Sequence, residues 1–289
     1  MTRPTLSGLL RRAGDERYAV PAFNIVDDLT MSAVLTTAAR RGSPVIVQAS
    51  TRTAEFYGPR QLRAMFVARR AASGASAVLH LDHCRVPELV LDCARAGWES
   101  ALFDGSDRDY REAVAVTSTV VEACAAYSME VEGEFERISS VGEDPATGTA
   151  STRRCAEFVE TTGVACFSPD LGTQHGMHSD DPVLRFELAA ELAALVPVVL
   201  HGGSGLSRES LRRAISAGVS KVNFSSVIKA AYVDGVREFA ARGGTEPLEL
   251  AGQLRDRIGE VCDLCITDVG SEGAAREGGS GERRVDLRL

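Results

Sequence analysis

The histidines of this sequence all lie at or just beyond the ends of apolar, strand-like runs. Three of them, His83, His175 and His201, follow three different runs. Three neutral imidazoles with one open position form the ligand set of a catalytic zinc site. Zinc in such a site polarises a carbonyl oxygen or activates a water molecule. We therefore predict one catalytic Zn²⁺ held by these three side chains.

Asp82, directly before His83, is the acid best placed to act beside this metal. A carboxylic acid there would protonate or polarise an aldehyde oxygen, whereas a structural carboxylate would orient a histidine. Both interpretations stay open at this point. His80 shares a strand face with Asp82, and His178 lies just beyond His175. These two are weaker candidates, which would assist the metal or compete with its ligands.

Three further acids lie at or near strand ends. Glu132 and Glu134 alternate within one run and therefore share a face, and Asp104 ends another run. These carboxylates are expected either to bind a second cation or to pair with basic neighbours. A structural role is favoured for Glu132 over Glu134.

Glycine and hydroxyl side chains follow the last two runs. Gly202-Gly203-Ser204-Gly205 comes after one, and Asn223-Phe224-Ser225-Ser226 after the other. Glycine lets backbone amides approach an anion, and a helix N-terminus favours negative charge. In barrel enzymes the loops after strands seven and eight frequently bind phosphate. We therefore predict a phosphate site here.

Short apolar runs alternate with longer segments of helical period, which is typical of parallel βα units. Eight such units in one chain of 289 residues favour an α/β fold of the (β/α)8, or TIM barrel, type. The barrel brings the strand ends to one mouth. The expected strands are Tyr18–Phe23, Pro44–Gln48, Ala77–Leu81, Ser100–Phe103, Met129–Glu134, Val164–Ser168, Val196–Leu200 and Lys221–Phe224.

Residues 1–269 are predicted to form this single barrel domain, and residues 270–289 a largely disordered C-terminal tail rich in Gly, Glu and Arg. The segment Arg137–Thr152 is a long loop after the fifth strand. Loops of this kind often serve as active-site lids.

Composition narrows the class of protein. The net charge is −8 and there is no basic stripe, so nucleic acid is not an expected partner. No apolar run approaches the ~20 residues that span a bilayer, and no secretory signal is recognisable. The seven scattered cysteines indicate reduced thiols in a cytoplasmic protein. A C-x-x-C at Cys262 and Cys265 is a weak zinc motif without a second pair.

Several segments, in order along the chain, resemble the class II fructose-bisphosphate and tagatose-bisphosphate aldolases. The resemblance runs from about residue 5 to about residue 240. The segments that carry it are Val20–Asn24, Ser43–Gln48, His80–His83, Asp104–Ser106, Val131–Glu134, Gly172–Gly176, Leu200–Gly205 and Lys221–Asn223.

The resemblance implies reversible aldol addition of dihydroxyacetone phosphate to an aldehyde, through a zinc-bound enediolate. It implies the same three histidines as zinc ligands and Asp82 as the acid at the aldehyde oxygen. A second cation, divalent or monovalent, is implied at Asp104 and Glu134. Substrate and phosphate contacts are expected at Asn24, Gly176, Gly202, Gly203, Ser204, Asn223, Ser225 and Ser226.

The sequence also departs from the family pattern. The family base is a glutamate eight residues beyond the position of Glu134, where this chain has Gly142, and the adjacent Glu143 is the candidate base. Ser139-Ser140 replaces the usual glycine pair on that loop, and Asp170 stands where a small apolar residue is common. These changes suggest a conserved donor half and an altered acceptor half, with an acceptor outside central glycolysis.

Two other functions fit the same residues. A zinc hydrolase of the same fold would use the metal to activate water. A non-catalytic phosphate-binding relative would have lost the base through its altered loop. In the aldolase interpretation the partners are dihydroxyacetone phosphate and an aldehyde, and the family resemblance implies a homodimer or homotetramer.

Overall fold

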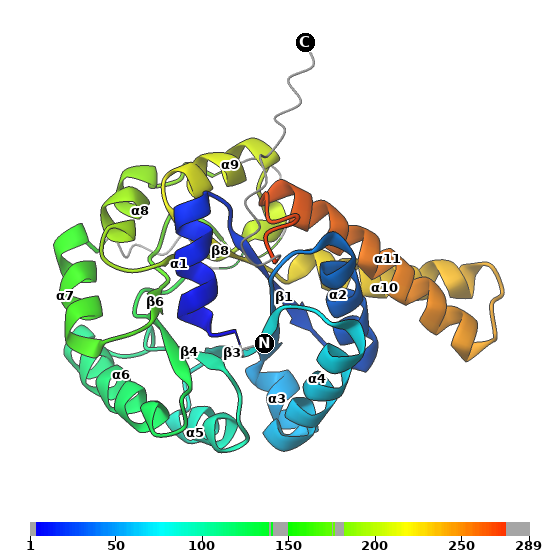
Figure 1. Ribbon diagram of the computed structural model, residues 1–289, viewed down its shortest axis with the longest axis horizontal. Helices are drawn as coiled ribbons and strands as arrows, with labels where there is room; N and C mark the ends of the chain where they lie inside the picture. Colours follow the sequence, from blue (N-terminus) through cyan, green and yellow to red (C-terminus); the bar gives the residue numbers. More distant parts are fainter. Residues whose placement is uncertain (1–3, 139, 141–149, 175, 177–181, 276–289) are drawn as a thin grey trace, which may run out of the picture.

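A computed structural model describes residues 4–138, 140, 150–174, 176 and 182–275 of the chain. In this part, eight parallel strands pair in chain order, and β1 pairs with β8 to close the barrel (Figure 1). The predicted (β/α)8 fold is confirmed. The strands are β1 Val20–Ile25, β2 Val45–Ser50, β3 Ala77–Cys84, β4 Ser100–Asp104, β5 Glu130–Glu134, β6 Cys166–Phe167, β7 Val198–Leu200 and β8 Val219–Phe224.

Helices surround the barrel, as Figure 1 shows. Strands buried on both faces need such a cover, and every residue of β1 and β4 is buried. The helices are α1 Leu6–Glu16, α2 Asp28–Arg41, α3 Thr51–Tyr57, α4 Pro59–Ser73, α5 Pro87–Arg95, α6 Tyr110–Ala125, α7 Thr152–Thr162, α8 Phe186–Ala193, α9 Arg208–Ser216, α10 Ser226–Ala241 and α11 Pro247–Asp268.

Helix α1 closes one end of the barrel. Its apolar side chains Leu6 and Leu10 share a buried cluster with Val20, Ile46 and Val199, which point into the barrel interior. Thr5 caps the helix by accepting a hydrogen bond from Gly8 N. Because Val20 and Ile46 lie near the N-terminal ends of their strands, α1 covers the end of the barrel at which the strands begin.

The C-terminal helix α11 packs back onto α2 after forming a hairpin with α10 that projects from the barrel (Figure 1). The chain stays packed beyond Val269, the predicted domain end. Ser271 is fully buried, and its hydroxyl lies 2.7 Å from Ser43 Oγ. The backbone N–H groups of Gly273 and Ala275 donate to the carbonyl oxygens of Arg41 and Gly42 at the end of α2. Residues 271–275 of the predicted tail therefore pack against the barrel, and residues 276–289 lie outside the described part.

The cysteines are buried free thiols, including Cys262 and Cys265 on α11. Burial raises the pKa of the Cys262 thiol well above its usual value. None of the helices in the described ranges combines the length and apolar composition needed to cross a membrane.

Candidate active site

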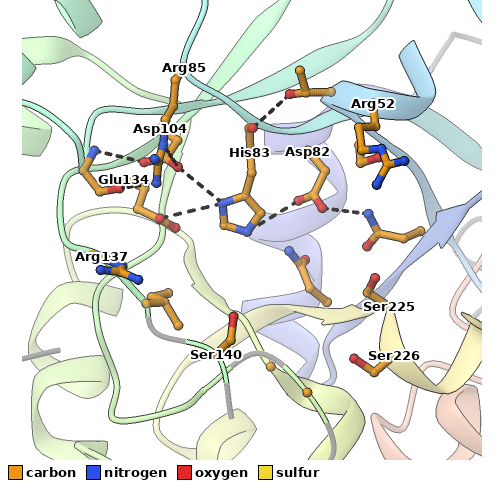
Figure 2. Close-up of a pocket in the computed structure, with 18 of the residues that line it drawn as sticks. Arg52, Asp82, His83, Arg85, Asp104, Glu134, Arg137, Ser140, Ser225 and Ser226 are labelled. Carbon is orange, nitrogen blue, oxygen red and sulfur yellow. Dashed lines mark hydrogen bonds and ion pairs between the residues drawn. The ribbon is translucent and has the colours of Figure 1, made fainter. Parts of the chain in front are cut away.

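A cavity of about 970 Å³ opens at the C-terminal mouth of the barrel, and Figure 2 looks into it. Most residues that the sequence singled out line it together, although they come from different strands. They are Asn24, Asp82, His83, Asp104, Glu134, Gly176, Gly202, Ser204, Asn223, Ser225 and Ser226. Three other predicted residues, His175, His178 and Glu143, lie outside the described part of the chain.

The end of β3 is bent so that His83 faces this cavity. The register between β3 and β4 shifts between Leu81 and Cys84, and His83 has a φ of +47°. Such a conformation is unfavourable for a residue with a side chain, and it is typical of functional sites. A hydrogen bond of 3.0 Å from Thr51 Oγ1 to the His83 carbonyl oxygen helps to hold it.

His83, Glu134 and His201 form a compact group of metal-ligating side chains. One ligand atom from each lies within 4.8 Å of the others. Glu134 stands between the two histidines, with Oε1 3.7 Å from His83 Nδ1 and Oε2 3.2 Å from His201 Nδ1. Two imidazoles and a carboxylate are common zinc ligands, so the donor set fits the metal predicted from the sequence. Glu134, expected at a second cation, thus adjoins the predicted zinc ligands.

The electrostatics of this group also favour a cation. Burial lowers the pKa of His83, but Asp82, Glu134 and Asp104 outweigh it and raise the value to about 10. Burial likewise lowers the pKa of His201, and hydrogen bonds to acidic neighbours again raise it. The acidic surroundings therefore stabilise positive charge on His83 and His201, and a bound metal cation would supply that charge in place of protons.

Asp104 pairs with a basic neighbour, one of the two alternatives that its sequence position left open. Arg85 Nε donates to its Oδ2 at 2.8 Å, and Ser106 N donates to its Oδ1 at 2.9 Å. The same Oδ2 lies 3.9 Å from His83 Nδ1. Burial raises the pKa of Asp104, but His83, Ser106 and Arg85 outweigh it and hold it well below its usual range.

Asp82 is held by a chain of buried amides. Asn24 Nδ2 donates to Asp82 Oδ2 at 2.7 Å, and Gln48 Nε2 donates to Asn24 Oδ1 at 3.0 Å. Asn24, predicted as a substrate contact, lines the cavity and also orients this acid. Asp82 Oδ1 lies 4.0 Å from His83 Nε2, which is an ion-pair distance and too long for a hydrogen bond. Burial raises the pKa of Asp82, but nearby His83 and the other positive groups lower it overall.

The opposite side of the cavity has features of an anion site. Gly202 has a φ of +72°, and Gly203–Gly205 forms a short 3-10 turn. Ser204 Oγ accepts a hydrogen bond of 3.1 Å from Ser225 N at the start of α10. A Cβ at Gly203 would lie 2.4 Å from the Val222 side chain, so only glycine fits here. Gly202, Ser204 and the residues at the start of α10 thus line one wall of the cavity, where a phosphate site is expected.

Positively charged side chains that the sequence reading did not select complete the lining. They are Arg52, Arg85, Arg137 and Lys229. Arg52 and Lys229 lie in the first turns of α3 and α10, the helices that directly follow β2 and β8. A search of the sequence that included the first helical turn after each strand end would have found both residues. Arg137 and Arg85 come from loops, where the sequence carries no periodic signal.

The loops on either side of the undescribed segments are tied together at their bases. Arg185 donates to the carbonyl oxygens of Asp170 and Ala150, at 3.0 and 2.9 Å. Glu136 Oε1 accepts from Ala150 N at 2.7 Å. The departure at Asp170 therefore lies at a junction between the β5–α7 and β6–α8 connections.

Comparison with known proteins agrees with this geometry. A sequence model of the class II fructose-bisphosphate aldolases matches residues 4–274. This chain belongs to that family. Class II aldolases are carbon–carbon lyases that typically depend on a metal and act on small phosphorylated sugars. The family resemblance identified in the sequence is confirmed.

Solved structures of similar proteins share the whole barrel. The YdjI aldolase from Escherichia coli K12 is 26% identical, with a TM-score of 0.84 over 94% of this chain and 98% of that one. A Coccidioides immitis protein named as a fructose-1,6-bisphosphate aldolase is 24% identical (TM-score 0.85; 92% and 96% covered). Fructose-bisphosphate aldolase from Campylobacter jejuni is 21% identical (TM-score 0.80; 93% and 94% covered). The last two likenesses concern the fold alone.

Proposed function

We propose that this class II aldolase is zinc-dependent and adds dihydroxyacetone phosphate reversibly to an aldehyde that does not belong to central glycolysis. The observation that carries the proposal is a shared cavity. It is lined by His83 and Glu134, which group with the buried His201, by the Asp82 carboxylate and by the glycine-rich anion site at the start of α10. A substrate with a phosphate at one end and a chelating hydroxyketone at the other matches these three features.

His83 and His201 would hold the zinc, with Glu134 beside them and the predicted third ligand His175 in the undescribed part. Zinc bound there supplies a Lewis acid for the ketone and hydroxyl oxygens of the substrate. The protein fixes the donor geometry, because Glu134, the last residue of β5, and His201, directly after β7, are almost fully buried. Buried ligands of this kind also keep bulk water away from the reacting carbon.

The substrate phosphate would bind at the mouth of β7 and β8. Backbone amides near Gly202 and Ser204 and the first turn of α10 provide donors, and Lys229 adds a positive charge on the same cavity wall. Binding energy gained at this remote end can position the hydroxymethyl carbon for proton removal. Glu143 remains our candidate for the base that removes this proton.

Asp82 would handle the proton on the aldehyde oxygen. Its lowered pKa keeps it ionised, which suits the cleavage direction, where the carboxylate accepts a proton from the hydroxyl group of the aldol. In the addition direction the same group, then protonated, returns the proton to the new alkoxide. The hydrogen bond from Asn24 aims the carboxylate for both steps.

The substrate proposed for the acceptor end of the cavity rests on the charged lining of that end. Arg52 and Arg85 stand on the side of the cavity where β2 and β3 end, close to Asp82 and His83 (Figure 2). Ser140, from the altered loop, also lines the cavity. Replacement of glycine by serine on that loop supports an acceptor different from that of the glycolytic members.

Proton exchange tests the proposed function directly. The protein and dihydroxyacetone phosphate are incubated in deuterated water without any aldehyde, with and without a chelator, and exchange at the hydroxymethyl carbon is followed by NMR. We expect exchange that the chelator abolishes and that zinc restores. A panel of aldehydes then identifies the acceptor.

The alternatives give different results in the same experiment. A zinc hydrolase would show no exchange but would cleave an ester or amide substrate. A non-catalytic relative would bind zinc and inorganic phosphate and show neither activity. Unchanged exchange in Glu143→Ala would contradict the role given to that residue.

A further inference from the structure

A buried ion pair lies in the barrel interior beneath the proposed metal site. Lys221 on β8 and Glu132 on β5 are both fully buried, and Lys221 Nζ donates to Glu132 Oε2 at 2.5 Å. Taking two charges out of water is unfavourable, and apolar side chains of similar volume often stabilise a protein as well or better. Stability alone therefore does not explain why this pair is present.

The second carboxylate oxygen of Glu132 contacts a residue of the site. Glu132 Oε1 lies 3.1 Å from Nε2 of His201, also fully buried. The other oxygen, Oε2, already accepts a hydrogen bond from the Lys221 ammonium, a group that can only donate, so Glu132 pairs with a cation as a carboxylate. An ionised carboxylate can only accept hydrogen bonds. Nε2 of His201 must therefore carry a proton and donate it to Glu132.

This assignment leaves the other ring nitrogen of His201 for the metal. Nδ1 lies 3.2 Å from Glu134 Oε2, on the side of the ring that faces the metal-ligating group. A neutral imidazole has one donor and one acceptor nitrogen, so protonation at Nε2 gives Nδ1 the lone pair that a metal requires. The ring of His201 also packs edge-on against His83, with centroids 4.6 Å apart.

His80 is not the histidine that Glu132 orients. His80 Nε2 lies 3.6 Å from Oε2, the oxygen to which Lys221 already donates, and this distance exceeds that of a hydrogen bond. His80 Nδ1 lies 2.9 Å from Ser100 Oγ instead. The hydrogen-bonded chain therefore runs from Lys221 through Glu132 to His201.

We propose that Lys221 and Glu132 are positioning residues that fix the tautomer and the ring orientation of His201, so that its Nδ1 binds the zinc. Lys221 holds one oxygen of the carboxylate, and Glu132 presents the other to Nε2. The inference rests on the proposed function only in taking His201 as a zinc ligand. Carboxylates that hydrogen-bond a metal-ligating histidine in this way strengthen metal binding in other proteins.

Zinc affinity, measured by competition with a chromophoric chelator, tests the proposal without using turnover. The double variant Lys221→Met/Glu132→Leu removes both charges and keeps the volume similar, so the fold should survive. We expect its zinc affinity to fall about 10–100-fold. Circular dichroism and thermal unfolding check that the protein is folded.

A second buried ion pair provides a matched control. Arg63 on α4 and Glu99, next to the N-terminal end of β4, lie 2.7 Å apart and are almost fully buried. Glu99 also accepts from Leu79 N at 3.0 Å, so Arg63→Met/Glu99→Leu disturbs the structure at least as much. This variant should keep the wild-type zinc affinity. An equal loss in both double variants would show a general structural effect and overturn the proposal.

The tautomer itself is visible in the wild-type protein. Long-range ¹H–¹⁵N NMR spectra of the zinc-loaded, ¹⁵N-labelled protein, with His201 assigned through His201→Gln, distinguish a protonated from a metal-bound nitrogen. We expect a protonated Nε2 and a metal-bound Nδ1. A metal-bound Nε2 overturns the proposal, even where the double variant fails to fold. Neither readout depends on aldolase activity, so failure of the proposed function would be recognised separately.

Discussion

Replacing Asp82 with asparagine should separate the two halves of the proposed reaction. Asp82 acts on the aldehyde oxygen and not on the donor carbon, so Asp82→Asn should leave deuterium exchange of dihydroxyacetone phosphate largely intact. Aldol cleavage and addition should fall by about 10²–10⁴-fold, the usual contribution of a positioned acid or base. We therefore expect a large loss of aldol cleavage and addition and only a small loss of deuterium exchange.

The structure indicates that this variant will fold. Asp82 is 7% exposed, and its main partner is the Asn24 amide at 2.7 Å. An asparagine keeps an oxygen at that position but loses the charge. Hydrogen bonds to charged groups contribute about 1.5–3 kcal/mol and neutral ones about 0.5–1.5, so the expected loss is about 1 kcal/mol. That is small against a typical folding free energy of about 5–15 kcal/mol.

Both rates can be measured on one preparation, which makes the exchange assay the internal control for folding and zinc content. Exchange is followed by NMR in deuterated water, and cleavage by coupled detection of dihydroxyacetone phosphate. Parallel loss of exchange and cleavage would show that Asp82 supports the metal or the donor instead, and would refute the role assigned to it. Full cleavage activity would refute it as well.

Three further outcomes follow from other parts of the structure. Gly202 has a φ of +72°, and a Cβ added there would lie 2.4 Å from a backbone oxygen. Gly202→Ala should therefore destabilise the protein by more than about 1 kcal/mol and weaken phosphate binding. The control Gly14→Ala, on α1 where a Cβ meets no other atom, should have neither effect. Urea unfolding and phosphate titration measure both effects. Burial raises the pKa of Asp170 above 3.8, so its contribution to stability is present below that pH and is lost as the pH rises through the folded value. Asp170→Asn should therefore be more stable than the wild type at pH 7 and equal to it below pH 3.8, and a pH series of unfolding free energies decides. Burial raises the pKa of Cys124 to about 11 and of Cys155 to about 12, so a thiol reagent at pH 8 should modify these residues only after unfolding.

Much of the site was predictable because chemistry-bearing residues in a barrel gather at strand ends. His83, Asp82 and His201 were selected on this basis, and the structure places all three at or beside one cavity or metal-ligating group. The strands were predictable for a different reason, because short runs that are apolar on both faces are typical of strands in a covered parallel sheet. The packing of α1 and α11 was not predicted, because α1 covers one end of the barrel and α11 packs on α2, and neither arrangement has a counterpart in the repeating βα pattern.

The pairing of particular groups could not be derived from spacing. Nothing in the sequence places Lys221 against Glu132, because the two come from β8 and β5 and meet only across the barrel interior. The contacts of Glu134 could not be derived either: it was expected at a second cation with Asp104, and it also lies between His83 and His201. Strand order predicts which residues share a mouth, but side-chain length and orientation decide which of them touch.

The packing of α11 and residues 270–275 against α2 has a consequence for the order in which the protein folds. These residues are synthesised after all eight strands, yet they contact the second helix and the β1 entry, where Ala19 N donates to Val269 O. The first half of the barrel therefore emerges from the ribosome without its cover, with the apolar flank of α2 exposed. We expect stalled chains that end before Pro247 to be cut readily by protease within α2, and chains that include residue 275 to resist; equal resistance would show that the early segments acquire stable structure without that partner.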